Sequence, residues 1–281
     1  MKIGIIGNGF VGKTVDEGFS LQSTNYVIDP KLNNDIASLE GINLDIIFIC
    51  VPTPMSDDGS IDTKIIFEVF SEIKKYCNNC LVVIKSTVTP EAIKGILDIY
   101  PKTIYNPEFL REKHALEDFI DSPALIFGGE KKYSEKAASI YNEHAICKTK
   151  NYIYTDIFSA SLIKYTINSF LALKVTFFNQ IFHIFSKADT SISWQDFTNA
   201  ISSDIRVGSS HMDVPGHDGK MGFGGACFPK DTAALLRYAQ SVGSKFTLLE
   251  EAIEVNNKIR SSYSSLDARE KEQGIFFNKK L

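Results

Sequence analysis

The stretch Lys2-Ile3-Gly4-Ile5-Ile6-Gly7-Asn8-Gly9-Phe10-Val11-Gly12 decides how the first half of the chain is interpreted. Its apolar residues form a short run typical of a buried strand, and three glycines in G-x-G-x-x-G spacing lead into a helical pattern. In such a turn the glycines allow a tight bend, close approach of the backbone to a pyrophosphate, and close packing of helix on strand. The helix N-terminus also attracts phosphate. We therefore predict a dinucleotide site formed by Gly7, Gly9, Phe10, Val11 and Gly12.

An acidic residue ends the second predicted strand, residues 26–29. Asp29 follows Gly12 at close to the roughly 20-residue spacing of dinucleotide-binding folds. A carboxylate there accepts hydrogen bonds from ribose hydroxyls and repels a 2′-phosphate, which favours NAD over NADP. Lys31 lies close by and is included among the predicted cofactor contacts.

Short apolar runs alternate with amphipathic ones through the first half of the chain. Further strands are predicted at residues 44–50, 81–85, 103–106 and 124–128, with helices at 63–76, 90–99 and 132–144. This alternation predicts an α/β fold, an N-terminal Rossmann-type doubly wound parallel sheet over residues 1–155. A mostly helical domain over residues 156–262 and a loosely held polar C-terminal tail over 263–281 are expected to follow.

The helical domain is predicted to begin with one long helix. Residues 156–187 contain no Gly or Pro, and apolar side chains occupy almost every face. A helix that is apolar all round is expected to be buried. Helical patterns continue at 194–201, 232–242 and 246–260, and the glycine-rich segment 208–228 is predicted to be a long functional loop.

Bulk composition excludes several classes of function. The 281 residues carry a net charge of −4, with 44% hydrophobic and 23% charged residues, so nothing attracts nucleic acid or an anionic membrane in general. Five cysteines and no leader-like or membrane-spanning run indicate free thiols and a cytoplasmic protein. No His, Cys and Asp group has metal-ligand spacing, so no metal is predicted.

The segment Gly222-Phe223-Gly224-Gly225-Ala226-Cys227-Phe228-Pro229-Lys230-Asp231 points to chemistry. Glycines before a cysteine let a ligand approach the backbone, and the following residues are predicted to be helical. A thiol just before a helix N-terminus has a lowered pKa, and Lys230 would favour the thiolate further. Although a lone cysteine is more often a small buried apolar residue, this context favours a nucleophile.

Six ordered motifs resemble the UDP-glucose and GDP-mannose dehydrogenase family. Besides the glycine fingerprint and the cysteine segment, they are Val51-Pro52-Thr53-Pro54, Ser86-Thr87-Val88, Asn106-Pro107-Glu108-Phe109-Leu110-Arg111-Glu112 and Leu162-Ile163-Lys164-Tyr165-Thr166-Ile167-Asn168. The resemblance covers roughly residues 1–260 and is too ordered for coincidence.

The resemblance implies a four-electron oxidation of a primary alcohol with two NAD, by default of UDP-glucose to UDP-glucuronate. It makes Cys227 the nucleophile that forms a thiohemiacetal and then a thioester. Lys164 and Asn168, four residues apart on one helix face, would stabilise oxygen anions. Asp231 and Glu108 would act on water. Two of these have structural alternatives: Asp231 as a helix cap and Lys164 as a lysine that reaches solvent.

The remaining implied roles concern binding. Thr53, Thr87, Glu112 and Lys230 match positions that contact NAD or order the site, Thr87 also counting as catalytic. The positions matching the family's substrate contacts are Glu108, Phe109, Leu110, Arg111, Glu112, Lys164, Asn168, Arg206, Gly216, Lys220 and Gly224. The long helix implies a homodimer, with Arg206 reaching the neighbouring subunit.

Two departures from the family keep alternatives open. Family members continue into a third, nucleotide-binding domain beyond the point that matches residue 260, and the loop between Arg206 and Cys227 is longer here. One alternative is a two-electron dehydrogenase of the β-hydroxyacid type, which needs the helix lysine and no loop cysteine. The other is a non-catalytic NAD-binding subunit.

Overall fold

The computed structural model describes residues 1–278 and divides the chain into two compact units. The first unit contains residues 1–53 and 61–164, and the second contains residues 54–60 and the chain from 165 onward. The alternating strands and helices that precede the long helix therefore belong to the first unit. The glycine-rich segment that contains Cys227 belongs to the second unit.

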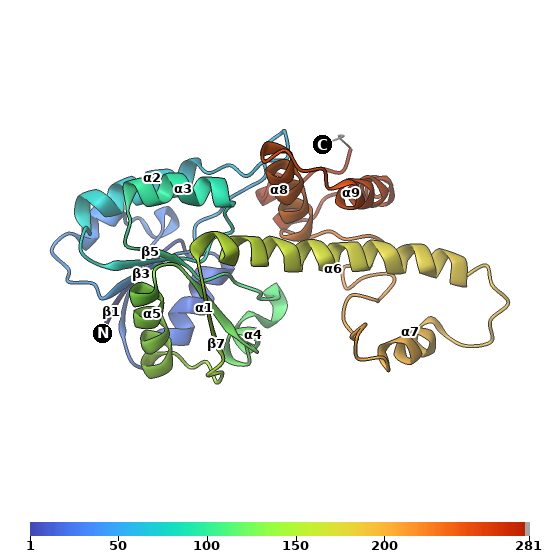
Figure 1. The fold of residues 1–281 in the computed structure, drawn as a ribbon, viewed down its shortest axis with the longest axis horizontal. Coiled ribbons are helices and arrows are strands. Elements are labelled where there is room, and N and C mark those ends of the chain that lie inside the picture. The colour runs from blue at the N-terminus through green and yellow to red at the C-terminus, as the bar shows by residue number, and fades with distance from the viewer. Residues whose placement is uncertain (279–281) are drawn as a thin grey trace. The chain divides into compact units, whose positions relative to one another are not determined.

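A seven-stranded sheet organises the first unit, in the order β2-β1-β3-β4-β5-β6-β7 (Figure 1). The strands are β1 (Lys2–Ile6), β2 (Thr24–Ile28), β3 (Ile46–Ile49), β4 (Leu81–Ile84), β5 (Thr103–Tyr105), β6 (Leu125–Gly128) and β7 (Tyr152–Thr155). Strands β1 to β5 are parallel, which confirms the predicted doubly wound fold. Strand β6 pairs antiparallel with β5, and β7, which the sequence pattern did not predict, runs parallel to β6.

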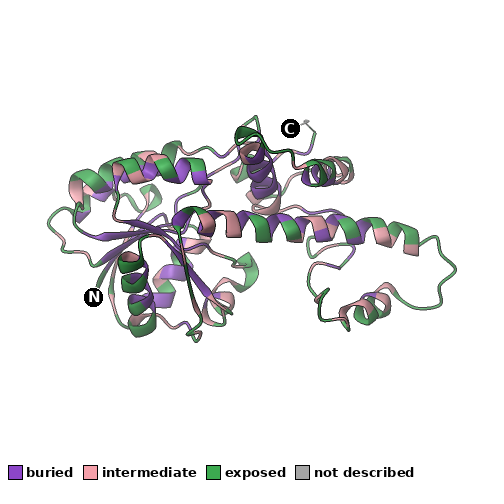
Figure 2. Ribbon diagram, viewed as in Figure 1, coloured by how far each residue is buried: buried purple, intermediate pink, exposed green. Residues whose placement is uncertain are grey.

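Helices cover both faces of this sheet because its central strands are apolar on both sides. They are α1 (Phe10–Phe19), α2 (Lys64–Tyr76), α3 (Pro90–Ile99), α4 (Ala115–Ile120) and α5 (Lys131–His144), with short 3₁₀ turns η1 (Pro30–Leu32), η2 (Ile36–Leu39) and η3 (Glu112–His114). Helices α2 and α3 pack on one face, and α1, α4 and α5 pack on the other. The central strands are accordingly buried between helices whose outer faces are exposed (Figure 2).

The core under α1, α4 and α5 is aromatic. The Phe48 ring on β3 lies 5.2 Å from Phe19 and 6.0 Å from Tyr141, and Phe119 and Phe127 contact the same Tyr141 ring. Tilted and edge-to-face rings of this kind add to the burial energy. The packing fixes the strand ends from which the polar site residues project.

Helices and long loops make up the second unit. Its helices are most of α6 (Ile157–Phe185), then α7 (Trp194–Ser202), α8 (Phe228–Ser241), α9 (Thr247–Arg260) and the short α10 (Ala268–Glu272). Helix α6 confirms the predicted long helix. Residues 203–227 contain no helix or strand, as the glycines predicted, and α8 begins earlier than the predicted residue 232, directly after Cys227.

Two expectations about the second unit are wrong. Helix α6 is not buried all round, since Phe170, Phe177 and Ile184 are each more than half exposed. Nor is the chain after α9 loosely held, at least up to residue 278. Glu270 is fully buried and Ile275 and Phe277 are nearly so, because polar residues of this segment find buried partners that composition alone does not reveal.

Within residues 1–278, no helix combines the length and the apolarity that crossing a membrane requires.

Candidate functional site

The glycine fingerprint forms the turn between β1 and α1. Gly7 has φ +97°, and a Cβ there would lie 2.7 Å from the Cys50 carbonyl oxygen; a Cβ on Gly12 would overlap the carbonyl oxygen of Gly7. Gly9, the residue before α1, faces open space and offers no capping side chain. The turn therefore excludes side chains where helix and strand meet and leaves the first N–H groups of α1 accessible to an anion.

Asp29 holds this turn through its carboxylate. Its Oδ2 accepts a hydrogen bond from the Asn8 amide at 2.7 Å, and its Oδ1 accepts one from the Lys31 amide at 2.9 Å. Lys31 itself lies in η1 and is exposed. The acidic residue therefore lies beside the glycine turn, as its spacing predicts.

Hydroxyl side chains cluster where β3 and β4 end. The Thr53 hydroxyl donates to the Thr87 carbonyl at 2.9 Å, and Ser86 donates to the Val51 carbonyl at 2.7 Å. The strand order reverses between β1 and β3, and ligands of open α/β sheets bind outside the carboxyl ends of strands at such a reversal. The structure thus brings Thr53 and Thr87 together in the first unit.

A buried lysine at the end of β4 pairs with Glu108. The Lys85 ammonium forms an ion pair with the Glu108 carboxylate and donates to Asn106 Oδ1 at 2.5 Å and to the Tyr141 hydroxyl at 3.0 Å. Tyr141 in turn donates to Asn106 Oδ1 at 2.8 Å. Burial lowers the pKa of Lys85 to about 7. The Glu108 carboxylate is therefore held by a network that sequence analysis did not predict.

Lys164 contacts the same segment from α6. Its ammonium donates to the Glu108 carbonyl oxygen and lies 4.9 Å from the centre of the Phe109 ring. With 7% exposure Lys164 does not reach solvent, which excludes that alternative. Arg111, by contrast, is exposed and paired with Asp118, and that carboxylate raises the pKa of Arg111. Leu110 is partly buried, and Glu112 opens η3 at the surface.

Cys227 is the residue immediately before α8 in the second unit. Its carbonyl accepts the Asp231 amide at 2.8 Å, the first turn of the helix, and its own side chain is partly exposed. Pro229 in this turn has no N–H and fits a helix start. A thiol in this position lies at the positive end of the helix dipole.

The carboxylate of Asp231 lies within the first turn of α8 and is 1% exposed. Its Oδ2 accepts a hydrogen bond from Asn168 Nδ2 at 2.6 Å, and its Oδ1 pairs with the Lys230 ammonium at 2.7 Å. Asp231 therefore does not cap the helix, and the Lys230 charge is directed to this carboxylate. The predicted Asn168, Asp231 and Lys230 form one buried cluster.

Side chains from α6 and α9 hold the glycine segment before Cys227. The Gly222 amide donates to Asn179 Oδ1 at 2.9 Å, and the Phe223 amide donates to Asn256 Oδ1 at 2.7 Å. Asn256 returns a hydrogen bond to the Phe223 carbonyl at 2.9 Å. The glycine-rich segment before Cys227 is thus a loop held in place by side chains of α6 and α9.

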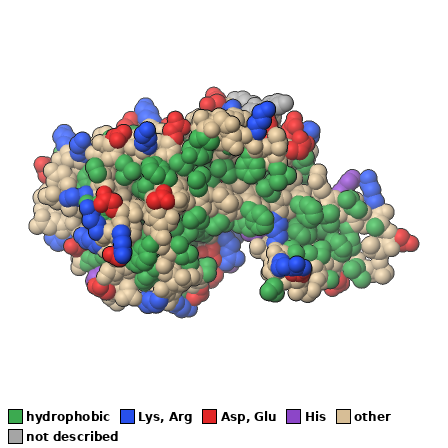
Figure 3. Space-filling model, in the orientation of Figure 1, with side chains coloured by type: hydrophobic (Ala, Val, Ile, Leu, Met, Phe, Trp, Pro, Cys, Tyr) green, Lys and Arg blue, Asp and Glu red, His purple; other side chains and the backbone are tan. Residues whose placement is uncertain are grey.

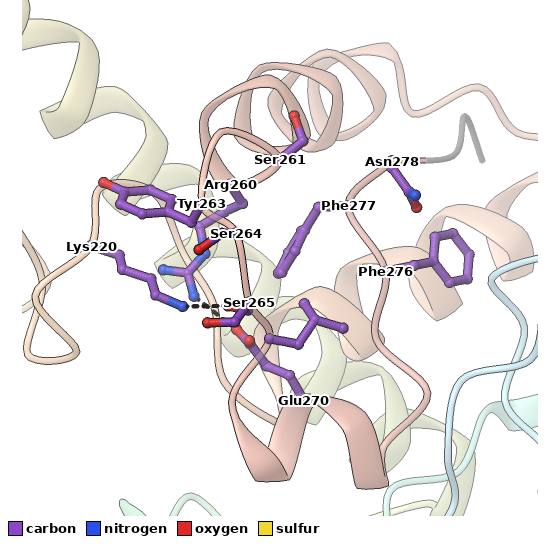
Figure 4. Close-up of a pocket in the computed structure, with 11 residues that line it drawn as sticks. Lys220, Arg260, Ser261, Tyr263, Ser264, Ser265, Glu270, Phe276, Phe277 and Asn278 are labelled. Atoms are coloured by element: carbon purple, nitrogen blue, oxygen red, sulfur yellow. Dashed lines mark hydrogen bonds and ion pairs between the residues drawn. The ribbon is translucent and has the colours of Figure 1, made fainter.

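Three predicted substrate residues lie apart from this cluster. Arg206 is exposed and pairs with Asp204 two residues away. The Gly216 amide donates to the Lys220 carbonyl at 2.9 Å and closes a tight turn. Lys220 lines a cavity of about 190 Å³ with residues of the C-terminal segment. Figure 4 shows Lys220, Arg260 and Glu270 meeting on one side of this cavity, with Phe276 on another.

Sequence analysis missed Lys85, Asn106 and Tyr141 around Glu108, and Glu270 beside the cysteine loop. Lys85 carries a usable signal, since a cation directly after four apolar strand residues is costly without a partner. Glu270 carries none, because it lies in a polar stretch that resembles a solvent-exposed surface.

Two family models match most of the chain. The NAD binding domain of the UDP-glucose/GDP-mannose dehydrogenase family matches residues 31–145, and the central domain of the same family matches residues 158–258.

Individual relatives agree with this match. The chain is 36% identical over 246 residues to UDP-glucose 6-dehydrogenase TuaD of Bacillus subtilis, covering 83% of this chain and 51% of that protein. It is 32% identical to UDP-glucose 6-dehydrogenase of Rickettsia felis, covering 80% and 49%. A solved UDP-glucose dehydrogenase from Pyrobaculum islandicum superposes with a TM-score of 0.74 at 25% identity, over 92% of this chain and 68% of that one. The chain spans about half the length of the curated relatives it matches.

Proposed function

Because the chain belongs to the UDP-glucose/GDP-mannose dehydrogenase family, we propose that it oxidises the 6-hydroxymethyl group of a nucleotide sugar to a carboxylate, with NAD as oxidant and Cys227 as nucleophile. UDP-glucose is the first substrate to test, since the relatives are named for it. The observation that carries the proposal is the position of Cys227 at the start of α8, four residues before the buried Asp231.

The glycine turn fits a dinucleotide. Gly9 faces open space before the uncapped start of α1, and neither Gly7 nor Gly12 has room for a side chain. Amides at the start of α1 would hold the pyrophosphate, and Asp29 would accept the ribose hydroxyls in addition to its backbone hydrogen bonds. Bound NAD supplies hydride acceptance, once for each of the two oxidations.

The proposed reaction passes through a covalent intermediate on Cys227. In the first oxidation the alcohol gives up a hydride to NAD and a proton, and so becomes an aldehyde. The Cys227 thiolate adds to the aldehyde carbon and forms a thiohemiacetal, and loss of a second hydride and proton gives a thioester. Water then breaks the carbon–sulfur bond, which releases the carboxylate and restores the thiol. The product is an acid and two NADH.

The buried polar groups have separate tasks in this scheme. The Lys164 ammonium and the Asn168 amide stabilise the oxygen anions that develop during oxidation and addition. The Glu108 carboxylate takes a proton from the attacking water; Lys85 pairs with this carboxylate, and Lys164 fixes the residue through its backbone carbonyl. The Asp231 carboxylate orients Asn168, with which it shares a 2.6 Å hydrogen bond. Thr53 and Thr87 order the strand ends.

The test measures NADH and acid produced from a panel of nucleotide sugars. We expect two NADH for each acid formed by the unaltered chain, and no acid from Cys227→Ala. The matched control is Cys77→Ala, since Cys77 is likewise a partly exposed cysteine outside any disulfide but lies in the loop before β4.

Two outcomes favour the alternatives. Full turnover by Cys227→Ala with one NADH per product would replace the proposal by a two-electron dehydrogenase. NAD binding without reduction, whatever the sugar nucleotide, would indicate a non-catalytic subunit. None of the cysteines within residues 1–278 forms a disulfide, which agrees with a reducing compartment, so the proposed location is the cytoplasm.

A homodimer through α6 belongs to the same proposal. Phe170, Phe177 and Ile184 repeat every seven residues, so they lie on one helix face, and each is more than half exposed. Figure 3 shows hydrophobic side chains gathered along this part of the molecule. Large exposed apolar side chains in a row are typical of an interface.

Sedimentation equilibrium tests the dimer. We expect the unaltered chain to sediment as a dimer and Phe177→Glu as a monomer, because a buried unpaired carboxylate opposes association. Leu248→Glu, at an equally exposed apolar residue on α9, serves as the control and should remain dimeric. Dimers of Phe177→Glu would contradict the assignment of this face.

A further inference from the structure

The segment that follows α9 is built around a buried carboxylate. Residues 261–278 lie beyond the part of the chain that the family model matches, yet Glu270 has no exposed surface. Helix α10 begins with a capping box in which Asp267 and Glu270 bond to each other's backbone amides. Such a carboxylate stays buried only when its remaining oxygen lone pairs are satisfied.

The second oxygen of Glu270 reaches the cysteine loop. Its Oε1 accepts a hydrogen bond from the Gly225 amide at 3.0 Å and from Arg260 Nη2 at 2.8 Å. Gly225 lies two residues before Cys227. Arg260, which is 2% exposed, also pairs through Nη1 with Asp218 at 2.7 Å. Charge-assisted hydrogen bonds of this kind are shorter and stronger than neutral ones.

The loop backbone rests directly on this ion pair. A Cβ at Gly224 would overlap Arg260 Nη2 and would lie 2.6 Å from the Glu270 Oε1. No larger residue therefore fits while the pair is in place. Figure 4 shows the Arg260 and Glu270 side chains directed toward each other.

Residues 261–278 also pack against α8 on the C-terminal side of Cys227. Ile275 and Phe277 pack with Ala233 of α8 and with Met55 in one buried apolar cluster, and the Gln273 carbonyl accepts the Met55 amide at 2.8 Å. The chain on both sides of Cys227 is thus fixed by residues 261–278.

We propose that residues 261–278 position the nucleophilic loop, with Glu270 as the positioning residue that holds Gly225 and thereby keeps Cys227 at the start of α8. The inference rests on the proposed role of Cys227 and adds a segment and a residue to it. Loss of the Glu270 carboxylate loosens the loop and moves the thiol away from the helix N-terminus.

The experiment follows alkylation of Cys227 by iodoacetamide across pH 6–10, with mass spectrometry to resolve the cysteines. In Glu270→Gln we expect the rate at pH 7 to fall about threefold or more, since a thiol that leaves a helix N-terminus loses thiolate stabilisation. The pH of half-maximal rate rises accordingly. A charge effect alone acts in the opposite direction, because removal of a nearby negative charge favours a thiolate.

Two further variants and a hydrogen-exchange measurement separate loss of loop positioning from other effects of the substitution. Glu272→Gln, at the exposed end of α10, is the matched control and should leave the rate unchanged. If Glu270→Gln fails to fold, Arg260→Lys keeps the charge but removes the two-pronged contact and should give the same slower alkylation. Hydrogen exchange of the peptide that contains Gly225 should quicken while peptides of the sheet stay protected.

Unchanged alkylation of Cys227 in folded Glu270→Gln overturns the inference, even if turnover requires Cys227. If instead Cys227→Ala retains turnover, the proposed function fails while the alkylation result still shows whether Glu270 holds the loop. The two failures are therefore distinguishable.

Discussion

Replacing Lys85 by methionine tests how the end of β4 tolerates a buried cation. Burial lowers the pKa of Lys85 from 10.5 to about 7, which corresponds to about 5 kcal/mol against the protonated form. Because the folded-state pKa lies below the unfolded value, this penalty is complete below pH 7. It is relieved as the pH rises toward 10.5, so Lys85 makes stability increase with pH in that window.

The assay measures the free energy of unfolding of the first unit by hydrogen exchange of β3 and β4 amides at increasing urea. Between pH 7 and 8 we expect the unaltered chain to gain about 1 kcal/mol relative to Lys85→Met. The window stays below pH 9 because burial raises the pKa of Cys50 to about 12 and of Cys147 to about 11. Those thiols contribute stability that is lost only when the pH exceeds their unfolded value of 9.0.

Two controls isolate the buried ammonium. Lys94→Met removes an exposed lysine from α3 and should leave the pH profile unchanged. Glu108→Gln removes the opposing carboxylate and should move the gain to lower pH, because it lowers the proton affinity of Lys85. Parallel pH profiles for the unaltered chain and Lys85→Met would refute the reasoning.

Three further variants test the first unit. Gly12→Ala should weaken NAD binding by about tenfold or more in calorimetry, since the added Cβ overlaps the Gly7 carbonyl and opens the phosphate turn; unchanged affinity contradicts the fit. Phe48→Ala, in the fully buried aromatic core, should cost about 3–5 kcal/mol in urea unfolding. Thr89→Ala removes the cap that accepts the Ala92 amide and should cost about 1 kcal/mol, with NAD affinity unaltered.

Local patterns predicted the parts of the fold that are local. The apolar strand before Gly7 and the glycine spacing predict β1 and α1, because both depend on neighbours a few residues away. The unbroken apolar run likewise predicts α6. The cysteine segment could be placed near a helix start, although α8 begins four residues earlier than its apolar pattern indicates, since Pro229 and Asp231 at a helix start carry no apolar period.

Long-range pairing explains what the sequence did not reveal. Gly225 and Glu270 are 45 residues apart, and Lys85 and Tyr141 are 56 apart, so neither pair leaves a local signature. The reversed direction of β6 depends on a single bridge between Tyr105 and Gly128. The exposed face of α6 was predicted to be buried because composition alone cannot distinguish an apolar core face from an apolar exposed face.

Buried cations connect these unpredicted features. Burying an ammonium or guanidinium group is costly unless a specific acceptor binds it. Each buried cation therefore indicates a place where the fold accepts a cost in stability to hold particular side chains in position. Lys85 and Lys164 both converge on Glu108, Lys230 is directed to Asp231, and Arg260 holds Glu270. These are the residues around the proposed water-activating carboxylate and the proposed nucleophile, which is why we expect their replacement to alter reactivity before it alters the fold.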